Sequence, residues 1–216
     1  IIKNENRALI TGSTRGLGLY LAKFFNKKGY KIILHGRKEE NLKDTLKSLP
    51  NQNDFEYYSC DLAKLDEIKG LCNFAKEKKV NLLINNAGVT CPGLSLKDLS
   101  ENDINLMLDV NLKANIFLIK YLNSYVENII NINSMVGLEP KKNRSIYSAS
   151  KFGMRGFSQS FNLEDISCKI LDVYPTNIKT WSDRENAMDI DFVLNKIYEA
   201  FTLNQNELVL DGRPNN

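Results

Sequence analysis

The sequence predicts an α/β domain of the doubly wound type, with a central parallel sheet of about seven strands and helices on both faces. Short runs rich in β-branched and aromatic residues alternate with longer segments in which apolar residues recur at helical spacing. A glycine-rich turn separates the first strand-like run from the first helical segment. No linker rich in Pro, Gly or Ser and no repeat interrupts this pattern, so we expect residues 1–216 to form one domain.

Seven segments have the composition of buried strands. They cover residues 8–11, 31–34, 55–58, 80–84, 129–132, 169–173 and 207–210. Helical segments lie between them, so we expect the strands to run parallel and to be joined by crossover helices. Sheets of this kind bind ligands at the carboxyl ends of their strands, where the strand order reverses.

The helical segments are identified by apolar residues that fall on one side of each. In the first, Leu17, Leu21 and Phe24 recur at helical spacing, and Gly29 follows where a C-terminal cap would stand. Longer helices are expected over residues 101–125, 145–163 and 189–203.

Composition argues against several classes of partner. The formal net charge is +3, from 29 basic and 26 acidic residues without a long basic block, so we expect neither nucleic acid nor a membrane as partner. No apolar run approaches the ~20 residues of a membrane span and the first residues lack a signal pattern, which predicts a cytoplasmic protein. Cys60, Cys72, Cys91 and Cys168 form no Cys-x-x-Cys pair, so we expect reduced thiols and no metal site.

The segment from Thr11 to Gly18 has the spacing of a nucleotide-binding turn. Its glycines would let a diphosphate approach the backbone, and the start of the following helix offers free N–H groups and a positive dipole. We therefore expect a dinucleotide here, with a plain tight turn as the alternative. The expected contacts in the turn are the glycines Gly12, Gly16 and Gly18 and, between them, Ser13, Thr14, Arg15 and Leu17.

The end of the second strand favours NADP(H) over NAD(H). A cofactor with a free ribose 2′-hydroxyl calls for an acidic side chain at this place, but Gly36 and Arg37 stand there. Together with Arg15 in the glycine turn, Arg37 supplies two guanidinium groups suited to a 2′-phosphate. The alternative is that both arginines are surface charges. The single histidine, His35, is interpreted as a strand-end residue without a catalytic role.

Three further residues combine into a catalytic hypothesis. Tyr147 and Lys151 are four residues apart, so on a helix they share one face. A positive charge close to a phenol favours its ionised form, and such a phenol can exchange a proton with a carbonyl or alcohol oxygen. Ser134, at the end of the fifth strand, would be a second donor to an oxygen that becomes negative during hydride delivery. Taken singly, each residue is better explained as structural; in combination they indicate catalysis.

The chain resembles the short-chain dehydrogenase/reductase family, whose members have a Rossmann domain. It matches the family's T-G-x-x-x-G-x-G turn at residues 11–18, the Asp-Leu pair at 61–62 and the N-N-A-G segment at 85–88. It also matches the helical Asn at Asn111, the strand-five Ser at Ser134, and Y-x-x-x-K at 147–151. The motifs stand in the family's order over nearly the whole chain.

The resemblance implies a role for each matched residue. Tyr147 would be the general acid in carbonyl reduction, Ser134 would bond the substrate oxygen, and Lys151 would bond the nicotinamide ribose. Asn111 would hold a water that links Lys151 to solvent. The remaining implied cofactor contacts are Asp61 and Leu62 at the adenine, Asn86, Ala87 and Gly88 along the adenosine and the central sheet, and Pro175, Ile178 and Thr180 at the nicotinamide carboxamide.

These observations predict an NADPH-dependent oxidoreductase that reduces a ketone or aldehyde, most similar to 3-oxoacyl-acyl-carrier-protein reductases. One alternative is a sugar or nucleotide-sugar substrate, and another is a catalytically silent protein that senses NADP(H). The resemblance also implies a homodimer or homotetramer that pairs through two long helices.

Two departures from the family pattern bear on the substrate. Thr176 stands where the family usually has Gly, a change that would shift the backbone near the nicotinamide. The segment after Thr180 is short, which indicates an open site with three interpretations: it admits a large or carrier-bound substrate, it is completed by a neighbouring subunit, or turnover is poor. Lys141, Lys142 and Arg144 are expected to border the pocket, either as a solvated charge run or as a site for an acidic group.

Overall fold

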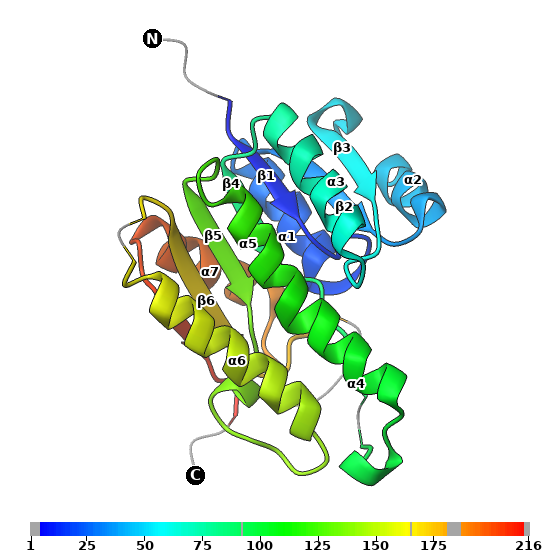
Figure 1. Cartoon of the computed structure of the whole chain (residues 1–216). Coiled ribbons are helices and arrows are strands. Elements are labelled where there is room, and N and C mark those ends of the chain that lie inside the picture. The colour runs from blue at the N-terminus through cyan, green and yellow to red at the C-terminus, as the bar shows by residue number, and fades with distance from the viewer. Residues whose placement is uncertain (1–4, 92, 165, 181–186, 214–216) are drawn as a thin grey trace.

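A computed structural model describes residues 5–91, 93–164, 166–180 and 187–213. Its centre is a parallel sheet of seven strands in the order β3-β2-β1-β4-β5-β6-β7 (Figure 1). The doubly wound fold and the number of strands expected from the sequence are confirmed. The strands are β1 (Arg7–Ile10), β2 (Lys31–Gly36), β3 (Phe55–Ser59), β4 (Leu82–Asn85), β5 (Asn128–Ile132), β6 (Lys169–Pro175) and β7 (Glu207–Leu210).

Helices cover both faces of the sheet, and an apolar core lies on each face. The helices are α1 (Gly16–Lys27), α2 (Glu39–Lys47), α3 (Leu65–Glu77), α4 (Glu101–Leu108), α5 (Ala114–Leu122), α6 (Ser145–Phe161) and α7 (Ile190–Thr202). One core includes side chains of α1, α2 and α7, and the other includes side chains of α3, α5 and α6. Side chains alternate along a strand, so Leu9 enters the second core while Ala8 and Ile10 enter the first. Burial on both faces explains why these strands read as continuous apolar runs.

The single helix expected over residues 101–125 is corrected by the structure. The chain forms α4, then a π-helical turn at Asp109–Lys113, and then α5. Ser100 and Asp103 start α4 with a capping box, in which each side chain bonds the other residue's backbone N–H. Apolar spacing did not reveal the π turn, because one turn with a different hydrogen-bond pattern leaves the apolar side of the segment nearly unchanged. Such turns are often found at functional sites.

The carboxyl ends of all strands form one edge of the sheet. The strand order reverses at β1, which pairs with β2 on one side and with β4 on the other. Figure 1 shows the loop that joins β5 to α6 at this carboxyl edge. Ligands of doubly wound sheets bind at this edge near the reversal, so the residues that follow β1, β4, β5 and β6 are the best placed to contact a ligand.

Candidate active site

The glycine-rich turn joins β1 to α1 at the point where the strand order reverses. Gly12 and Gly16 have positive φ angles of 63° and 55°, a conformation that residues with side chains rarely adopt. A Cβ atom on Gly18 would collide with the carbonyl oxygen of Gly12 and the side-chain amide of Asn86. The glycine spacing seen in the sequence therefore reflects backbone conformation at two positions and close packing at the third.

The end of β4 fixes the shape of this turn. Asn86 Nδ2 donates to the carbonyl oxygens of Thr11 (2.9 Å) and Gly12 (3.0 Å). Thr11 Oγ1 accepts from the backbone N–H groups of Asn86 (2.9 Å) and Ala87 (3.0 Å). Asn86 thus braces the centre of the sheet. Contact of Asn86, Ala87 and Gly88 with an adenosine stays a prediction.

His35 supports the turn from β2, a contact that the sequence did not predict. Its side chain is 2% exposed, and its Nδ1 accepts the N–H of Gly12 at 3.1 Å. Its Nε2 lies 3.1 Å from the carbonyl oxygen of Cys60, so these two contacts require the neutral tautomer with the proton on Nε2. Burial lowers the pKa of His35 to about 4. The signal in the sequence was a polar ring inside an otherwise apolar strand.

We expect His35 to make the protein less stable in mild acid. Its pKa is depressed in the folded state, so its contribution is complete above the unfolded value of about 6.5 and is lost as the pH falls toward 4. The full loss, reached near pH 4, amounts to about 3 kcal/mol of unfolding free energy, of which roughly 2 kcal/mol falls between pH 7 and pH 5. Urea unfolding of wild type and His35→Gln at pH 7 and pH 5 measures it, since Gln keeps an acceptor for Gly12 but takes up no proton.

The comparison of the two proteins separates the effect of His35 from that of Asp172, whose contribution to stability changes with pH in the opposite direction. Burial raises the pKa of Asp172 to about 6. The contribution of this carboxyl group to the unfolding free energy is therefore lost as the pH rises from about 4 to 6. Both proteins keep Asp172, and its effect cancels in the comparison. The same pH slope in both proteins would contradict the role given to His35.

The start of α1 is open to an anion. Arg15, its N-cap residue, makes no side-chain capping hydrogen bond, and the first helical turn contains no acidic residue. The N–H groups of that turn and the helix dipole therefore favour a negatively charged ligand. Arg15 and Arg37 are both exposed, and because β1 and β2 are neighbours they lie at the same edge of the sheet. A Cβ on Gly36 would press on the side chain of Thr14, at 2.9 Å.

Asp61 and Leu62 follow β3 at this edge. Asp61 Oδ1 accepts the N–H of Ala63 (3.0 Å), and the Asp61 N–H donates to Glu67 Oε2 (2.6 Å). Leu62 is 3% exposed. These contacts form the turn into α3 and hold Asp61 in place. Its contact with an adenine stays a prediction, as does the backbone contact of Leu62.

β5 and α6 bring the predicted catalytic residues together. Lys151 Nζ donates to the carbonyl oxygen of Ile132, at the end of β5, at 3.1 Å. The same ammonium lies 5.8 Å from the centre of the Tyr147 ring. Ser134 Oγ accepts the N–H of Val136 at 3.2 Å, and a hydroxyl that accepts such a bond can still donate its own proton. Lys151 is 5% exposed, whereas Ser134 and Tyr147 are half-buried.

Asn133 fixes β5 relative to α6, although the sequence did not single it out. It is 4% exposed, its Oδ1 accepts the N–H of Ser134 (2.9 Å), and its Nδ2 donates to the carbonyl oxygen of Lys151 (3.2 Å). One amide thus bonds to the backbone of two predicted catalytic residues. The signal was a pair of alternating amides, Asn131 and Asn133, at the end of an apolar strand.

Asn111 lies in the π-helical turn and is fully buried. Its Oδ1 accepts the N–H of Val89 and its Nδ2 donates to the carbonyl oxygen of Val89, both at 2.8 Å. Its Nδ2 also lies 3.3 Å from Ser150 Oγ, next to Lys151. Asn111 therefore joins the segment after β4 to α6. Its part in a water relay stays a prediction.

The segment after β6 also reaches the carboxyl edge. Pro175 ends β6, Ile178 bridges to Met188, and the N–H of Thr180 donates to the carbonyl oxygen of Ile178 at 2.8 Å. Contact of Pro175, Ile178 and Thr180 with a nicotinamide stays a prediction. The short segment after Thr180 that was expected to leave the site open falls mainly on residues 181–186, which lie outside the described residues.

A chain of buried polar side chains crosses the sheet beneath α6 and was not predicted. Asn85 Nδ2 donates to Asn131 (2.9 Å), Asn131 Nδ2 donates to Ser158 (3.1 Å), and Ser158 donates to Asp172 (3.0 Å). The Tyr174 hydroxyl donates to the other oxygen of Asp172 at 3.0 Å. These bonds connect α6 to β5 and β6, and they help to set the position of the helix that carries Tyr147 and Lys151.

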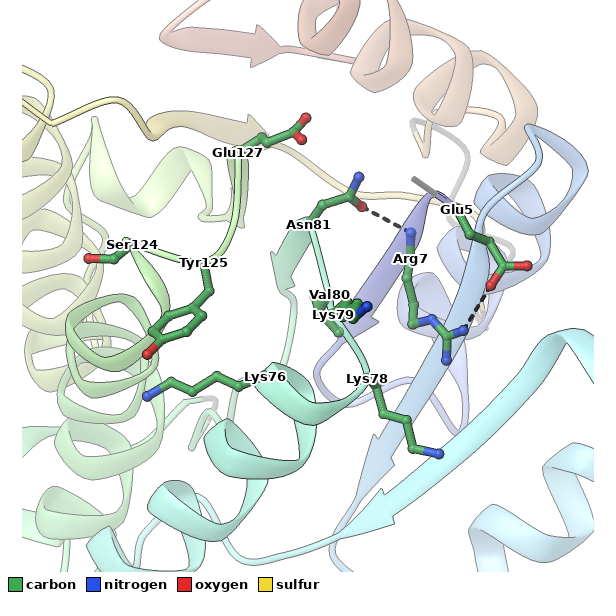
Figure 2. Close-up of a pocket in the computed structure, with 10 residues that line it drawn as sticks. All are labelled: Glu5, Arg7, Lys76, Lys78, Lys79, Val80, Asn81, Ser124, Tyr125 and Glu127. Atoms are coloured by element: carbon green, nitrogen blue, oxygen red, sulfur yellow. Dashed lines mark hydrogen bonds and ion pairs between the residues drawn. The ribbon is translucent and has the colours of Figure 1, made fainter. Parts of the chain in front are cut away.

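A pocket of about 390 Å³ lies at the opposite, amino edge of the sheet, as Figure 2 shows. Three of its cations have partners within the protein: Arg7 bonds Glu5 and Glu56, Lys78 bonds Glu56, and Lys76 lies 4.5 Å from the centre of the Tyr125 ring. The pocket is also far from every predicted catalytic residue, because those stand at the carboxyl ends of the strands. It is therefore not the candidate active site.

Two kinds of feature are absent from the described ranges. Among those residues, His, Cys, Asp and Glu side chains form no group of three or more that could hold a metal ion. Within the same residues no helix is long and apolar enough to cross a membrane. Burial raises the pKa of the Cys60 and Cys72 thiols to about 12 and that of Cys168 to about 11, so these thiols are unreactive at neutral pH.

Comparison with solved structures confirms the fold. An alcohol dehydrogenase from the archaeon Thermococcus sibiricus, complexed with 5-hydroxy-NADP, has a TM-score of 0.87 at 20% identity, over 98% of this chain and 99% of that one. A metagenomic short-chain oxidoreductase in complex with NADP has a TM-score of 0.80 at 23% identity, over 98% of each chain.

Comparison with characterised sequences identifies the family. The 3-oxoacyl-[acyl-carrier-protein] reductase of Rickettsia conorii is 31% identical over 198 residues, which cover 88% of this chain and 80% of that protein. The reductase of the same name from Rickettsia prowazekii is 33% identical over 162 residues, 73% of this chain, and the match spans only 65% of its length. The model of the short chain dehydrogenase family matches residues 6–190. The chain therefore belongs to the short-chain dehydrogenase family of oxidoreductases.

Proposed function

We propose that this chain is an NADPH-dependent oxidoreductase that reduces a ketone or aldehyde, with Tyr147 as the general acid. The observation that most directly supports this is the buried Lys151 ammonium, held by the carbonyl oxygen of Ile132 beside the Tyr147 ring. An ammonium has three N–H donors, and Ile132 accepts from one of them. A buried charge is costly without further partners, and ribose hydroxyls of a bound dinucleotide would supply them.

The chemistry of reduction assigns a task to each donor. Negative charge develops on the carbonyl oxygen as hydride reaches the carbon, so donors must already point at that oxygen. Tyr147 would donate its proton there, and Ser134 would donate a hydrogen bond. Lys151 would favour the phenolate that Tyr147 leaves behind. Asn111 would hold the water through which Lys151 exchanges protons with solvent.

The residues present fit NADP(H). The positive φ angles of Gly12 and Gly16 and the uncapped start of α1 suit a diphosphate. Arg15 and Arg37 would bond a ribose 2′-phosphate. When bound, the reduced nicotinamide supplies the hydride, and the protein supplies orientation and electrostatics. The NADP-type ligands named for the two structural neighbours support the same cofactor class here.

The names of the sequence relatives support a 3-oxoacyl thioester as the substrate class. The test is NADPH oxidation by the purified protein with 3-oxoacyl thioesters on a small carrier, simple ketones, aldehydes and oxidised sugars. We expect the highest kcat/KM with the thioesters. Faster turnover of the sugars would contradict the substrate class, and no oxidation with any carbonyl would contradict the activity.

Arg37→Ala should weaken NADPH binding and leave NADH binding nearly unchanged. A hydrogen bond to a charged phosphate contributes about 1.5–3 kcal/mol, which corresponds to about a 10- to 150-fold rise in Kd for NADPH. Fluorescence titration of both cofactors with wild type and variant measures this. Exposed Lys38, the next residue, offers the control Lys38→Ala. An unchanged preference for NADPH over NADH in Arg37→Ala would show that Arg37 does not bind the 2′-phosphate.

A homodimer or homotetramer through the helices of the second core remains a proposal. Phe161 of α6 is buried, Phe117 and Phe157 pack against the core, and Phe152 is 39% exposed on α6. Phe152 is therefore the ring on this face best placed to meet a second copy. Light scattering on the purified protein measures the assembly.

A further inference from the structure

The chain continues beyond β7 as a short tail at the carboxyl edge of the sheet. Leu210 ends β7 and pairs with Pro175 of β6. Thr176, which stands where a glycine was expected, holds this tail with its backbone and its side chain. Its N–H donates to the carbonyl oxygen of Leu210 (2.9 Å), and its Oγ1 accepts the N–H of Gly212 (2.9 Å). The Thr176 hydroxyl thus does what a glycine could not do at this position.

Arg213 fastens the tail to the loop between β5 and α6. Its two terminal nitrogens bond both carboxylate oxygens of Glu139, at 2.7 and 3.2 Å. Asp211 accepts from the backbone N–H of Arg213 (3.0 Å) and from its guanidinium. The guanidinium lowers the pKa of Asp211 to about 2 and holds the pKa of Glu139 below its ordinary value. Isolated exposed ion pairs contribute little to stability. Here the Arg213 guanidinium bonds both oxygens of Glu139, and its side chain is already held by Asp211, so this pair costs less side-chain entropy than an isolated one.

The loop that receives Arg213 connects Ser134 with Tyr147. Near its start, the N–H of Glu139 donates to the carbonyl oxygen of Met135 at 2.8 Å. Near its end, Arg144 donates to Thr90 Oγ1 at 2.9 Å, and its guanidinium carbon lies 5.8 Å from the centre of the Tyr147 ring. A movement of this loop would therefore displace Ser134 and Tyr147, the residues proposed to bond the substrate oxygen.

We propose that the Thr176–Gly212 and Arg213–Glu139 contacts, here called the tail clasp, hold the β5–α6 loop in the position in which Ser134 and Tyr147 bind the carbonyl substrate. Thr176 and Arg213 are then positioning residues that determine how the carbonyl substrate binds. The inference rests on the proposed function. The glycine turn and Arg37 follow β1 and β2, on the other side of the strand-order reversal, so we expect the clasp to affect substrate binding more than NADPH binding.

The test separates substrate binding from cofactor binding. In Arg213→Gln, we expect KM for the best carbonyl substrate to rise about three- to fivefold, with kcat and KM for NADPH changed less than about twofold. Thr176→Val, which keeps the shape and removes the hydroxyl, should change KM in the same direction. The double variant Glu139→Gln/Arg213→Gln should be no worse than either single variant, because both remove one interaction.

Lys196→Gln is the matched control. It breaks the Lys196–Glu199 ion pair (2.8 Å) on the surface of α7, away from the clasp, and should leave every constant unchanged. Amide hydrogen exchange over residues 138–145 gives a readout that needs no turnover, and we expect faster exchange in Arg213→Gln than in wild type or Lys196→Gln. An unchanged substrate KM, or equal exchange in all three proteins, would overturn the clasp. If wild type reduces no carbonyl, the proposed function fails, while exchange still decides whether the clasp holds the loop.

Discussion

Replacement of Tyr147 by Phe is expected to lower kcat/KM for carbonyl reduction by about 10²–10⁴-fold. The variant removes the phenolic proton and keeps the half-buried ring that lies between Arg144 and Lys151. Since the ring is retained, we expect the fold and the NADPH Kd to stay close to wild type. NADPH oxidation at saturating substrate, together with a cofactor titration of the same preparation, measures both.

Tyr125→Phe is the matched control for this substitution. Tyr125 is 57% exposed and lies at the amino edge of the sheet, where its ring meets Lys76. Its loss of a hydroxyl should not change turnover. Equal activity in wild type and Tyr147→Phe would remove Tyr147 as the acid. Loss of NADPH binding in Tyr147→Phe would show that the hydroxyl binds the cofactor. The lower rate would then be no evidence for proton transfer by Tyr147.

Gly18→Ala should nearly abolish dinucleotide binding, by about 100-fold or more in Kd, and should destabilise the protein by about 1–3 kcal/mol. A methyl group at this position would meet the carbonyl oxygen of Gly12 and the amide of Asn86. The first is backbone, and the second is held by two hydrogen bonds, so neither can move without distorting the turn. Calorimetric titration with NADPH and urea unfolding measure the two effects.

Gly156→Ala adds the same methyl group at a position where we expect a small gain in stability and no loss of NADPH binding. Gly156 is an exposed residue within α6, and a Cβ there would meet no atom within 4 Å. Alanine inside a helix is favoured over glycine by about 0.5–1 kcal/mol, so this variant should be slightly more stable and bind NADPH normally. Normal NADPH binding by Gly18→Ala as well would show that the turn can relax, and the packing account of Gly18 would be wrong.

Two kinds of element were predicted with different success. The inner strands were found because burial on both faces demands a continuous apolar run. The edge strand β7 is partly exposed, yet it begins and ends where expected. The helices α2 and α3 were not assigned ranges. The sequence of α2 has only two leucines, Leu42 and Leu46, among polar residues, whereas α3 buries an apolar face that the sequence analysis did not single out. The π turn at Asn111 was missed because it alters hydrogen bonding and not composition. Local pattern therefore locates short apolar runs more readily than amphipathic helices or a change in helical hydrogen bonding.

Local spacing and backbone conformation specify the order of the elements, the glycine turn and the positions of Ser134, Tyr147 and Lys151, so these features could be predicted from the amino-acid sequence. The partners that hold these residues in place are visible only in the folded chain. The N–H of Gly12 bonds His35, and the backbone groups of Ser134 and Lys151 bond Asn133. Arg213 bonds Glu139, which is 74 residues away in the sequence. Such partners depend on which strands become neighbours and where each loop leaves the sheet, and both are properties of the whole folded chain.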